Sequence, residues 1–273
     1  MWWYNKLSWG GIKARFKMQY KVDKLDVNIY PSNREMGQAA AKAIGDDLCD
    51  LLSKKSEVNV MFAAAPSQNT TLEALLDDKR IDWSRINAFH MDEYVGISID
   101  RPQSFRNYLK VHIFDRKPFK SVNLINADGP DAEKVASDYA KLLKERGLDL
   151  IVLGIGETGH IAFNDPPEAR FNEPKLAKVI ELGEVSRMQQ VHDGCFATLD
   201  DVPKQAITVT IPAFVAASRL HCVVPGPTKC KAVKATLEGP VSEDCPATVL
   251  RLHDNAHLYI DKDSASLLKR TIS

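Results

Sequence analysis

Short apolar runs alternate along the chain with stretches in which apolar residues recur at helical spacing. The runs have the length and composition of buried strands, and the first of them alternates between polar and apolar positions. They are Asp26–Tyr30, Val58–Ala65, Ile86–Met91 and Leu150–Leu153. Strands that alternate with helices in this way pair in parallel through right-handed crossovers. The pattern therefore predicts an α/β fold with a Rossmann-like, mostly parallel sheet and helices on both faces, in a single domain.

The same periodicities predict the remaining elements. We expect strands at Val122–Asn126, Ala177–Leu182, Ile207–Ile211, Leu220–Val224 and His257–Ile260, and helices at Gln103–Phe114, Asp131–Arg146 and Ser264–Leu268, with further helices after Ser32, Thr71, Pro212 and Lys229. The first 17 residues are aromatic and basic and lack a periodic pattern. Residues 1–20 are therefore assigned to an N-terminal extension that is compatible with disorder, and residues 21–273 to the folded domain.

Composition narrows the class of protein. The chain has 36 Lys and Arg against 36 Asp and Glu, so its net charge favours neither a nucleic acid nor an acidic membrane as partner. No stretch approaches the ~18 apolar residues of a membrane span. The five cysteines form no CxxC pair and leave one over if paired, which is typical of reduced thiols in a cytoplasmic enzyme.

Polar side chains gather where four of the predicted strands end. The clusters are Ser67–Thr71, Asp92–Tyr94, Glu157–Asp165 and Thr228–Lys229. Ligands of open α/β sheets bind outside the carboxyl ends of the strands, so these clusters are expected to meet at one edge. Carboxylates and a histidine are costly to leave at the ends of buried strands, and their convergence predicts an active site.

Individual residues in these clusters allow simpler interpretations as well. His160 can move a proton near neutral pH, although a lone histidine is more often a surface or satisfied core residue. Lys229 precedes a helix and suits a phosphate, although it could be an ordinary surface lysine. Asp92 and Glu93 are adjacent, so in an extended segment only one of them can face a pocket. His160 and Asp165 lack the spacing of a ligand set, and no catalytic metal is expected.

Three motifs resemble those of the glucosamine-6-phosphate deaminase (isomerase) family, whose relatives include the 6-phosphogluconolactonases. They are FHMDEYVG at Phe89–Gly96, GIGETGHIAFNDP at Gly154–Pro166 and PGPTKCKAVKATLEGP at Pro225–Pro240. The resemblance runs in the same order from about Val27 to Leu268. The lactonase branch usually has GHTASLFP after its glycine, so GHIAFN favours the deaminase branch.

The resemblance implies a role for each matching residue. Asp92 would be the base that moves a proton between C2 and C1 of the opened amino sugar phosphate, His160 would help to open the pyranose ring, and Asp165 would belong to the same relay. Glu93, Glu157 and Thr158 would support them. The phosphate would be held by Lys229 and the loop Ser67, Gln68, Asn69 and Thr70. The implied enzyme is a glucosamine-6-phosphate deaminase-like hydrolase/isomerase without a cofactor, yielding fructose 6-phosphate and ammonia.

The chain departs from the family pattern at several of these positions. Thr158 stands where the well-known enzymes have an aspartate that orients the histidine, and Asp165 replaces a glutamate. The phosphate loop lacks the family's glycines. The family has a phosphate-binding arginine near the start of the helix after Leu182. In this chain its position is occupied by Gln189 or Gln190, although Arg187 lies a turn away. These differences identify a divergent member of the family.

Other functions remain open at this stage. The alternatives are a sugar-phosphate lactonase, in which His160 would activate water, and a non-catalytic sugar-phosphate sensor that kept the fold and lost the relay. In each case the expected partner is a small phosphosugar. Some relatives are hexamers and others monomers, so the sequence leaves a homo-oligomer open.

Overall fold

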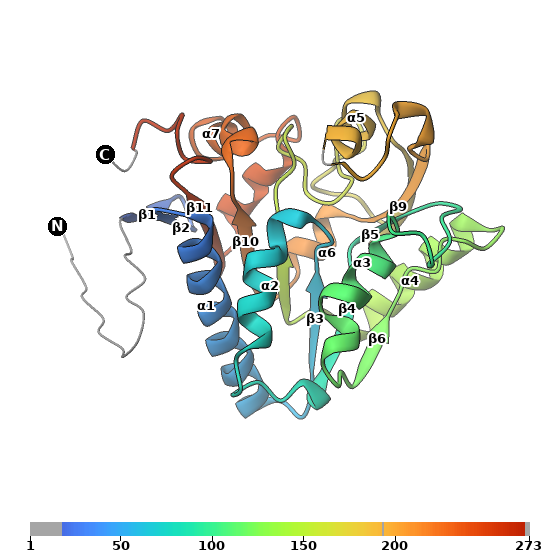
Figure 1. The fold of residues 1–273 in the computed structure, drawn as a ribbon, viewed down its shortest axis with the longest axis horizontal. Coiled ribbons are helices and arrows are strands. Elements are labelled where there is room, and N and C mark those ends of the chain that lie inside the picture. The colour runs from blue at the N-terminus through green and yellow to red at the C-terminus, as the bar shows by residue number, and fades with distance from the viewer. Residues whose placement is uncertain (1–17, 193, 271–273) are drawn as a thin grey trace.

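The structure is a computed structural model that describes residues 18–192 and 194–270. Its main feature is an eight-stranded sheet of order β1-β2-β11-β10-β7-β3-β4-β6, in which every neighbouring pair is parallel except β1 with β2 (Figure 1). In that order the strands are Met18–Val22, Leu25–Tyr30, Ala256–Asp261, Arg219–Val224, Leu150–Leu153, Val58–Phe62, Ile86–His90 and Ser121–Asn123. The mostly parallel α/β sheet in a single domain is confirmed.

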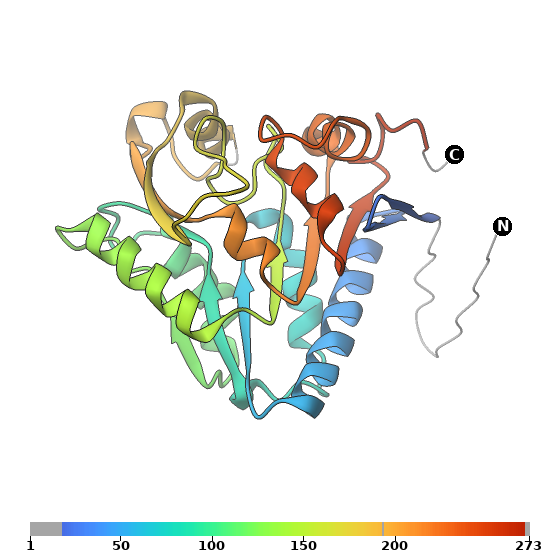
Figure 2. The same cartoon turned by 180° about the vertical axis from the view of Figure 1, so that it is seen from behind.

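Helices cover both faces of this sheet because its central strands are apolar on both sides. In β3 and β7, Val60 and Val152 pack towards one core, while Met61 and Ile151 pack towards another. On the first side lie α1 (Asn33–Lys54), α2 (Asn69–Leu76) and α3 (Phe105–His112), which are in front in Figure 1. On the second lie α4 (Ala132–Arg146), α6 (Ile211–Val215) and α7 (Cys230–Glu238), and Figure 2 shows α4 and α6 from that side.

A second, smaller sheet was not anticipated. It has the order β5-β9-β8, is antiparallel throughout, and consists of Asp92–Tyr94, Gln205–Val209 and Ala177–Glu181, with α5 (Glu184–His192) following β8. Of these three, β8 and β9 were predicted as strands but pair antiparallel outside the mostly parallel main sheet, and Asp92–Tyr94 was expected to follow a strand rather than to form one. The apolar residues of β8 and β9 indicate burial but do not specify the partner strand, which tertiary packing selects.

Two other expectations fail at the ends of the chain. Met18–Tyr20 belong to β1, which pairs with β2, so the boundary of the extension at residue 20 is wrong, while residues 1–17 lie outside the described part of the chain. The helix expected at Ser264–Leu268 is a series of turns. Its serine side chain and backbone bond to Asp261 instead, and Leu268 is nevertheless buried. The apolar residues of this segment have the spacing of a buried helix face, but the segment that buries them is not helical.

Candidate active site

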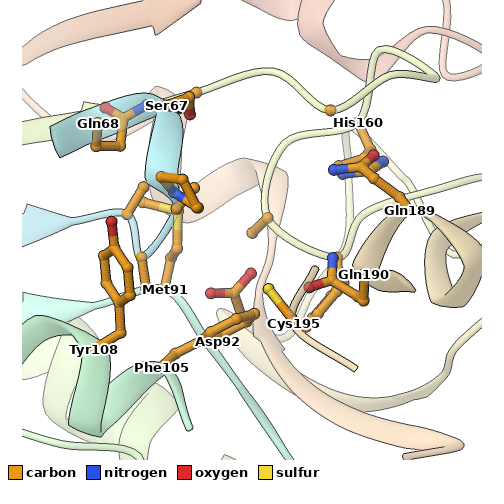
Figure 3. A pocket seen from close by; sticks show the side chains of 18 of the residues that line it. Ser67, Gln68, Met91, Asp92, Phe105, Tyr108, His160, Gln189, Gln190 and Cys195 are labelled. Carbon is orange, nitrogen blue, oxygen red and sulfur yellow. Dashed lines mark hydrogen bonds between the residues drawn. The ribbon is translucent and has the colours of Figure 1, made fainter. Parts of the chain in front are cut away.

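The carboxyl ends of β3, β4 and β7 open into a cavity of about 330 Å³ that the second sheet and α5 complete. Figure 3 shows Ser67, Gln68 and Tyr108 on one wall and His160, Gln189 and Gln190 on the other, with Asp92 pointing into the space between them. The lining residues with polar or charged side chains are Ser67, Gln68, Asp92, Gln103, Tyr108, His160, Gln189, Gln190, Cys195 and Lys229. Three of the four predicted clusters contribute their principal candidates to this cavity, and the fourth contributes part of its loop.

Asp92 and Glu93 point to opposite sides of β5, as their adjacency requires. Asp92 faces the cavity and is 7% exposed. Glu93 is fully buried behind it and accepts hydrogen bonds from the Ser104 hydroxyl at 2.7 Å and from the backbone and Nε of Arg106, each at 3.0 Å. Burial, reinforced by the negative charge of Glu93, raises the pKa of Asp92 well above its usual range. Asp92 is thus a cavity carboxylate with increased basicity.

His160 is held over a glycine in the loop that follows β7. A Cβ atom at Gly156 would lie 1.9 Å from His160 Nε2, so only glycine leaves room for the ring. The next glycine, Gly159, has φ +91° and lies close to Cys245, whose Sγ would be 2.5 Å from a Cβ there. The glycines of this loop therefore set the position of the imidazole, which is 7% exposed.

Asp165 takes the position of an orienting carboxylate beside the ring. Its Oδ1 lies 3.1 Å from His160 Nδ1 and accepts a 2.7 Å hydrogen bond from the Thr158 hydroxyl, while the Ser186 hydroxyl donates to Oδ2. Burial alone would raise the pKa of Asp165, but the bonds from His160, Ser186 and Thr158 outweigh it and lower the pKa to about 2. A carboxylate only accepts, so the Nδ1 proton lies on this side and Nε2 is left to accept.

The small sheet connects the two catalytic candidates. Asp92 in β5 pairs with Thr208 in β9, and the Thr208 hydroxyl accepts a 3.1 Å hydrogen bond from the backbone N–H of Phe163, three residues after His160. The Asn164 side chain also donates to the Val209 carbonyl at 2.8 Å. The strand that carries Asp92 and the loop that carries His160 are therefore fixed to the same central strand.

The predicted phosphate loop is divided by the structure. Ser67 and Gln68 line the cavity, and the Gln68 amide donates to the Val223 carbonyl at 3.1 Å. Asn69 and Thr70 are not among the described lining residues. The Asn69 side chain accepts the Tyr108 hydroxyl, and Thr70 packs against α1, where a Cβ at Gly37 would lie 2.6 Å from its methyl carbon. Half of the predicted loop thus contacts neighbouring helices and is absent from the described cavity lining.

Lys229 reaches the cavity from the turn that follows β10. It occupies the 3₁₀ turn Pro227–Lys229 that leads into α7 and is 9% exposed. Among the described lining residues it is the one lysine or arginine. The expected arginine is not replaced by Arg187, whose guanidinium donates to the carbonyls of Leu199 and Val202.

Sequence reasoning missed several residues that reach the cavity. Tyr108 and Cys195 carried no motif, Gln103 belongs to the segment Pro102–Phe105 that shares the family resemblance but was given no role, and Gln189 and Gln190 were considered only as replacements for an arginine. Gln189 Oε1 accepts the Glu157 backbone N–H at 3.1 Å, which links α5 to the His160 loop, while the Glu157 side chain is not among the lining groups. A buried polar residue in a short helix has no periodic signal that could have identified it.

The described residues add neither a metal site nor a membrane-spanning helix to this picture. They contain no group of three or more His, Cys, Asp or Glu side chains arranged to hold a metal ion. Within the same part of the chain, none of the helices has the length and apolar character needed to cross a membrane.

The chain is similar to proteins of one family along most of its length. Residues 31–259 match the family described as glucosamine-6-phosphate isomerases/6-phosphogluconolactonase. The glucosamine-6-phosphate deaminase of Lactobacillus delbrueckii subsp. bulgaricus is 34% identical over 231 residues, covering 84% of this chain and 97% of the relative. That of Bacillus cereus is 31% identical over 249 residues, covering 91% of each.

Solved structures agree with this assignment. A monomeric glucosamine-6-phosphate deaminase matches with a TM-score of 0.80 at 29% identity, covering 88% of this chain and 99% of its own. The 6-phosphogluconolactonase of Thermotoga maritima matches with a TM-score of 0.73 at 20% identity, covering 88% and 100%, and shares the fold. The deaminase relatives are thus nearer in sequence than this lactonase, and the chain belongs to the glucosamine-6-phosphate isomerase/6-phosphogluconolactonase family.

Proposed function

We propose that this protein is an amino-sugar-phosphate deaminase-isomerase, which converts glucosamine 6-phosphate or a close epimer and water into a ketose 6-phosphate and ammonia. One observation carries the proposal: a basic carboxylate, Asp92, and an oriented imidazole, His160, face the same cavity. The reaction needs one group that removes a carbon-bound proton and another that moves a proton at the ring oxygen. Water replaces the amino group, so the reaction is hydrolytic as well as an aldose-to-ketose isomerisation.

His160 acts first, at the pyranose ring. Its Nδ1 proton is directed at the Thr158 hydroxyl, 2.9 Å away, and at Asp165 Oδ1, 3.1 Å away. Its Nε2 therefore takes the proton of the C1 hydroxyl and returns it to the ring oxygen as the bond between C1 and the ring oxygen opens. The adjacent carboxylate stabilises the imidazolium that forms in between. Asp165 and Thr158 therefore orient the His160 ring, a role for which the well-known enzymes use an aspartate at the Thr158 position.

Asp92 acts on the opened sugar. It takes the proton from C2 and delivers it to C1, while the C1 carbonyl oxygen gains a proton from the ammonium group on C2. Water then adds to the resulting C2 imine, and ammonia leaves to give the ketone. Burial suits this role because a carboxylate whose pKa is raised is a stronger base than an exposed one. Glu93, which is held by Ser104 and Arg106, adds negative charge behind it without reaching the cavity.

The phosphate is proposed to bind at Lys229 and Ser67. Lys229 provides the positive charge, and it directly precedes the N-terminus of α7, where the helix dipole favours an anion. Ser67 provides a hydroxyl donor from the turn after β3. A sugar anchored at Lys229 and Ser67 would be held in the cavity that Asp92 and His160 also line, and such positioning contributes to the rate.

The test is ammonia release by the purified protein from glucosamine 6-phosphate and from its galactosamine epimer, beside hydrolysis of 6-phosphogluconolactone. We expect ammonia and ketose in equal amounts from at least one amino sugar. Hydrolysis of the lactone without ammonia from either amino sugar would contradict the proposal, and so would binding without any turnover. A cytoplasmic location and a homo-oligomer stay predictions that this assay does not address.

A further inference from the structure

Ser186 contacts the proposed ring-opening pair from a different part of the fold. It lies in the first turn of α5, is 4% exposed, and donates its hydroxyl hydrogen to Asp165 Oδ2. The other carboxylate oxygen accepts from Thr158 and faces His160 Nδ1 at 3.1 Å. Both oxygens of Asp165 are thereby engaged, one from its own loop and one from α5.

The hydrogen bond from Ser186 compensates for the short side chain of Asp165 in the His160 loop. Asp165 is one methylene shorter than glutamate, and Thr158 offers a hydroxyl where a second carboxylate would otherwise fix the ring. A carboxylate held only at Oδ1 could rotate about its terminal bond, which has a broad energy profile. A second donor at Oδ2 restricts that rotation and keeps Oδ1 directed at the imidazole.

The same face of α5 makes a second attachment to the His160 loop. Gln189 lies three residues after Ser186, and residues at this spacing share a helix face. Its Oε1 accepts the backbone N–H of Glu157 at 3.1 Å. The helix therefore holds the loop at points before and after His160, which fixes the position of α5 relative to the imidazole ring.

We propose that Ser186 is a positioning residue of the reaction, which acts through Asp165 to hold the His160 ring in the orientation that opens the sugar. The inference rests on the proposed function, because it assigns ring opening to His160. It extends that function by adding a side chain that does not line the cavity and to which no motif of the sequence pointed.

The test uses Ser186→Ala and Ser186→Thr, with Val185→Ala as the matched control. Val185 neighbours Ser186 on the same helix but is 65% exposed. For Ser186→Ala we expect kcat to fall about tenfold, the size typical of losing one oriented hydrogen bond at a reacting pair, with KM for the sugar phosphate nearly unchanged. Ser186→Thr keeps a hydroxyl and should recover most of kcat, and the control should match the wild type.

A spectroscopic measurement separates positioning from a general loss of structure. The Nδ1 proton of His160, assigned by nitrogen-15 labelling and a His160→Gln variant, should exchange faster with water in Ser186→Ala and remain as in the wild type in the other two variants. An unchanged kcat and an unchanged proton signal in Ser186→Ala would overturn the proposal. A fall in kcat that Ser186→Thr does not reverse, with the signal unchanged, would also overturn it.

These outcomes are distinct from a failure of the proposed function. If the wild type released no ammonia from any amino sugar phosphate, the proposed reaction would be wrong. In that event the exchange rate of the His160 proton would still show whether Ser186 orients the ring, because that signal requires no turnover.

Discussion

Asp92 and Asp165 are two carboxylates at one site whose surroundings shift their pKa values in opposite directions. Asp92 is buried, with the Glu93 charge close behind it, and its pKa is raised. Asp165 is also partly buried, but three donors surround it and its pKa is lowered from 3.8 to about 2. The comparison shows that burial alone does not set the chemistry of a carboxylate. The donors around it decide whether it serves as a base or as a fixed charge.

The largest effect is expected when the basic member of the pair is replaced. Asp92→Asn keeps the size of the side chain but cannot take a proton, so kcat should fall by about 10³-fold or more while sugar phosphate binding survives. Steady-state ammonia release and calorimetric binding would measure the two effects. Ammonia release at the wild-type rate would remove Asp92 from the mechanism.

A smaller loss is expected at the other carboxylate. Asp165→Asn leaves the His160 ring with an amide in place of a fixed negative charge, and kcat should fall by about a hundredfold. Asp138→Asn on the exposed side of α4 is the control, since that side chain is 64% exposed. If Asp165→Asn behaved like this control in the ammonia assay, the assigned difference between the two carboxylates would not hold.

Lys229 provides a contrast to both carboxylates, because its proposed role is to bind the phosphate and not to transfer a proton. Lys229→Met should raise KM by about tenfold to a hundredfold, which is the loss of affinity expected when a hydrogen bond to a charged group is removed. The variant should change kcat much less. Lys231→Met, which removes an exposed lysine of α7, controls for the change in net charge. A reversed pattern in initial-rate kinetics, with kcat reduced and KM unchanged, would argue against phosphate binding at Lys229.

The smallest effects concern stability and should have opposite signs. A raised pKa costs stability above the ordinary pKa of aspartate, so Asp92→Asn should raise the melting temperature at pH 7 by a few degrees. A lowered pKa contributes stability that is lost as pH falls from about 4 to 2, so Asp165→Asn should lower stability at pH 7 by about 1–2 kcal/mol. Thermal unfolding at pH 7 and pH 3 measures both. Shifts of the same sign would show that the two surroundings do not differ as described.

Much of the main sheet could be predicted from the sequence because its strands are apolar on both faces and lie between helices. The strand ends placed Asp92, His160 and Lys229 at one cavity for the same reason. Periodicity does not report which strands pair, so the antiparallel sheet of Asp92–Tyr94 with its two partners was missed. In the same way, Ser264–Leu268 has helical spacing, but hydrogen bonds to Asp261 hold it in turns.

The supporting side chains were the least predictable part of the site. Ser186 and Gln189 act through contacts between α5 and the His160 loop, and such contacts leave no local pattern. Asn69 and Thr70 differ in the opposite way, because a motif pointed to them as phosphate ligands, whereas in the structure they contact Tyr108 and Gly37 and are not among the described residues that line the cavity. Local sequence indicated the chemistry, and the tertiary contacts selected which members of each cluster reach the cavity.

The central claim is that Asp92 moves the proton from C2 to C1, and isotopic labelling tests it most directly. Glucosamine 6-phosphate carrying deuterium at C2 would be turned over by the wild type and by Asp92→Asn, with the ketose product analysed by NMR. The account predicts slower turnover of the labelled sugar by the wild type, deuterium at C1 of the ketose or in the solvent, and no ketose from the variant. The same labelled ketose from Asp92→Asn at the wild-type rate would contradict it.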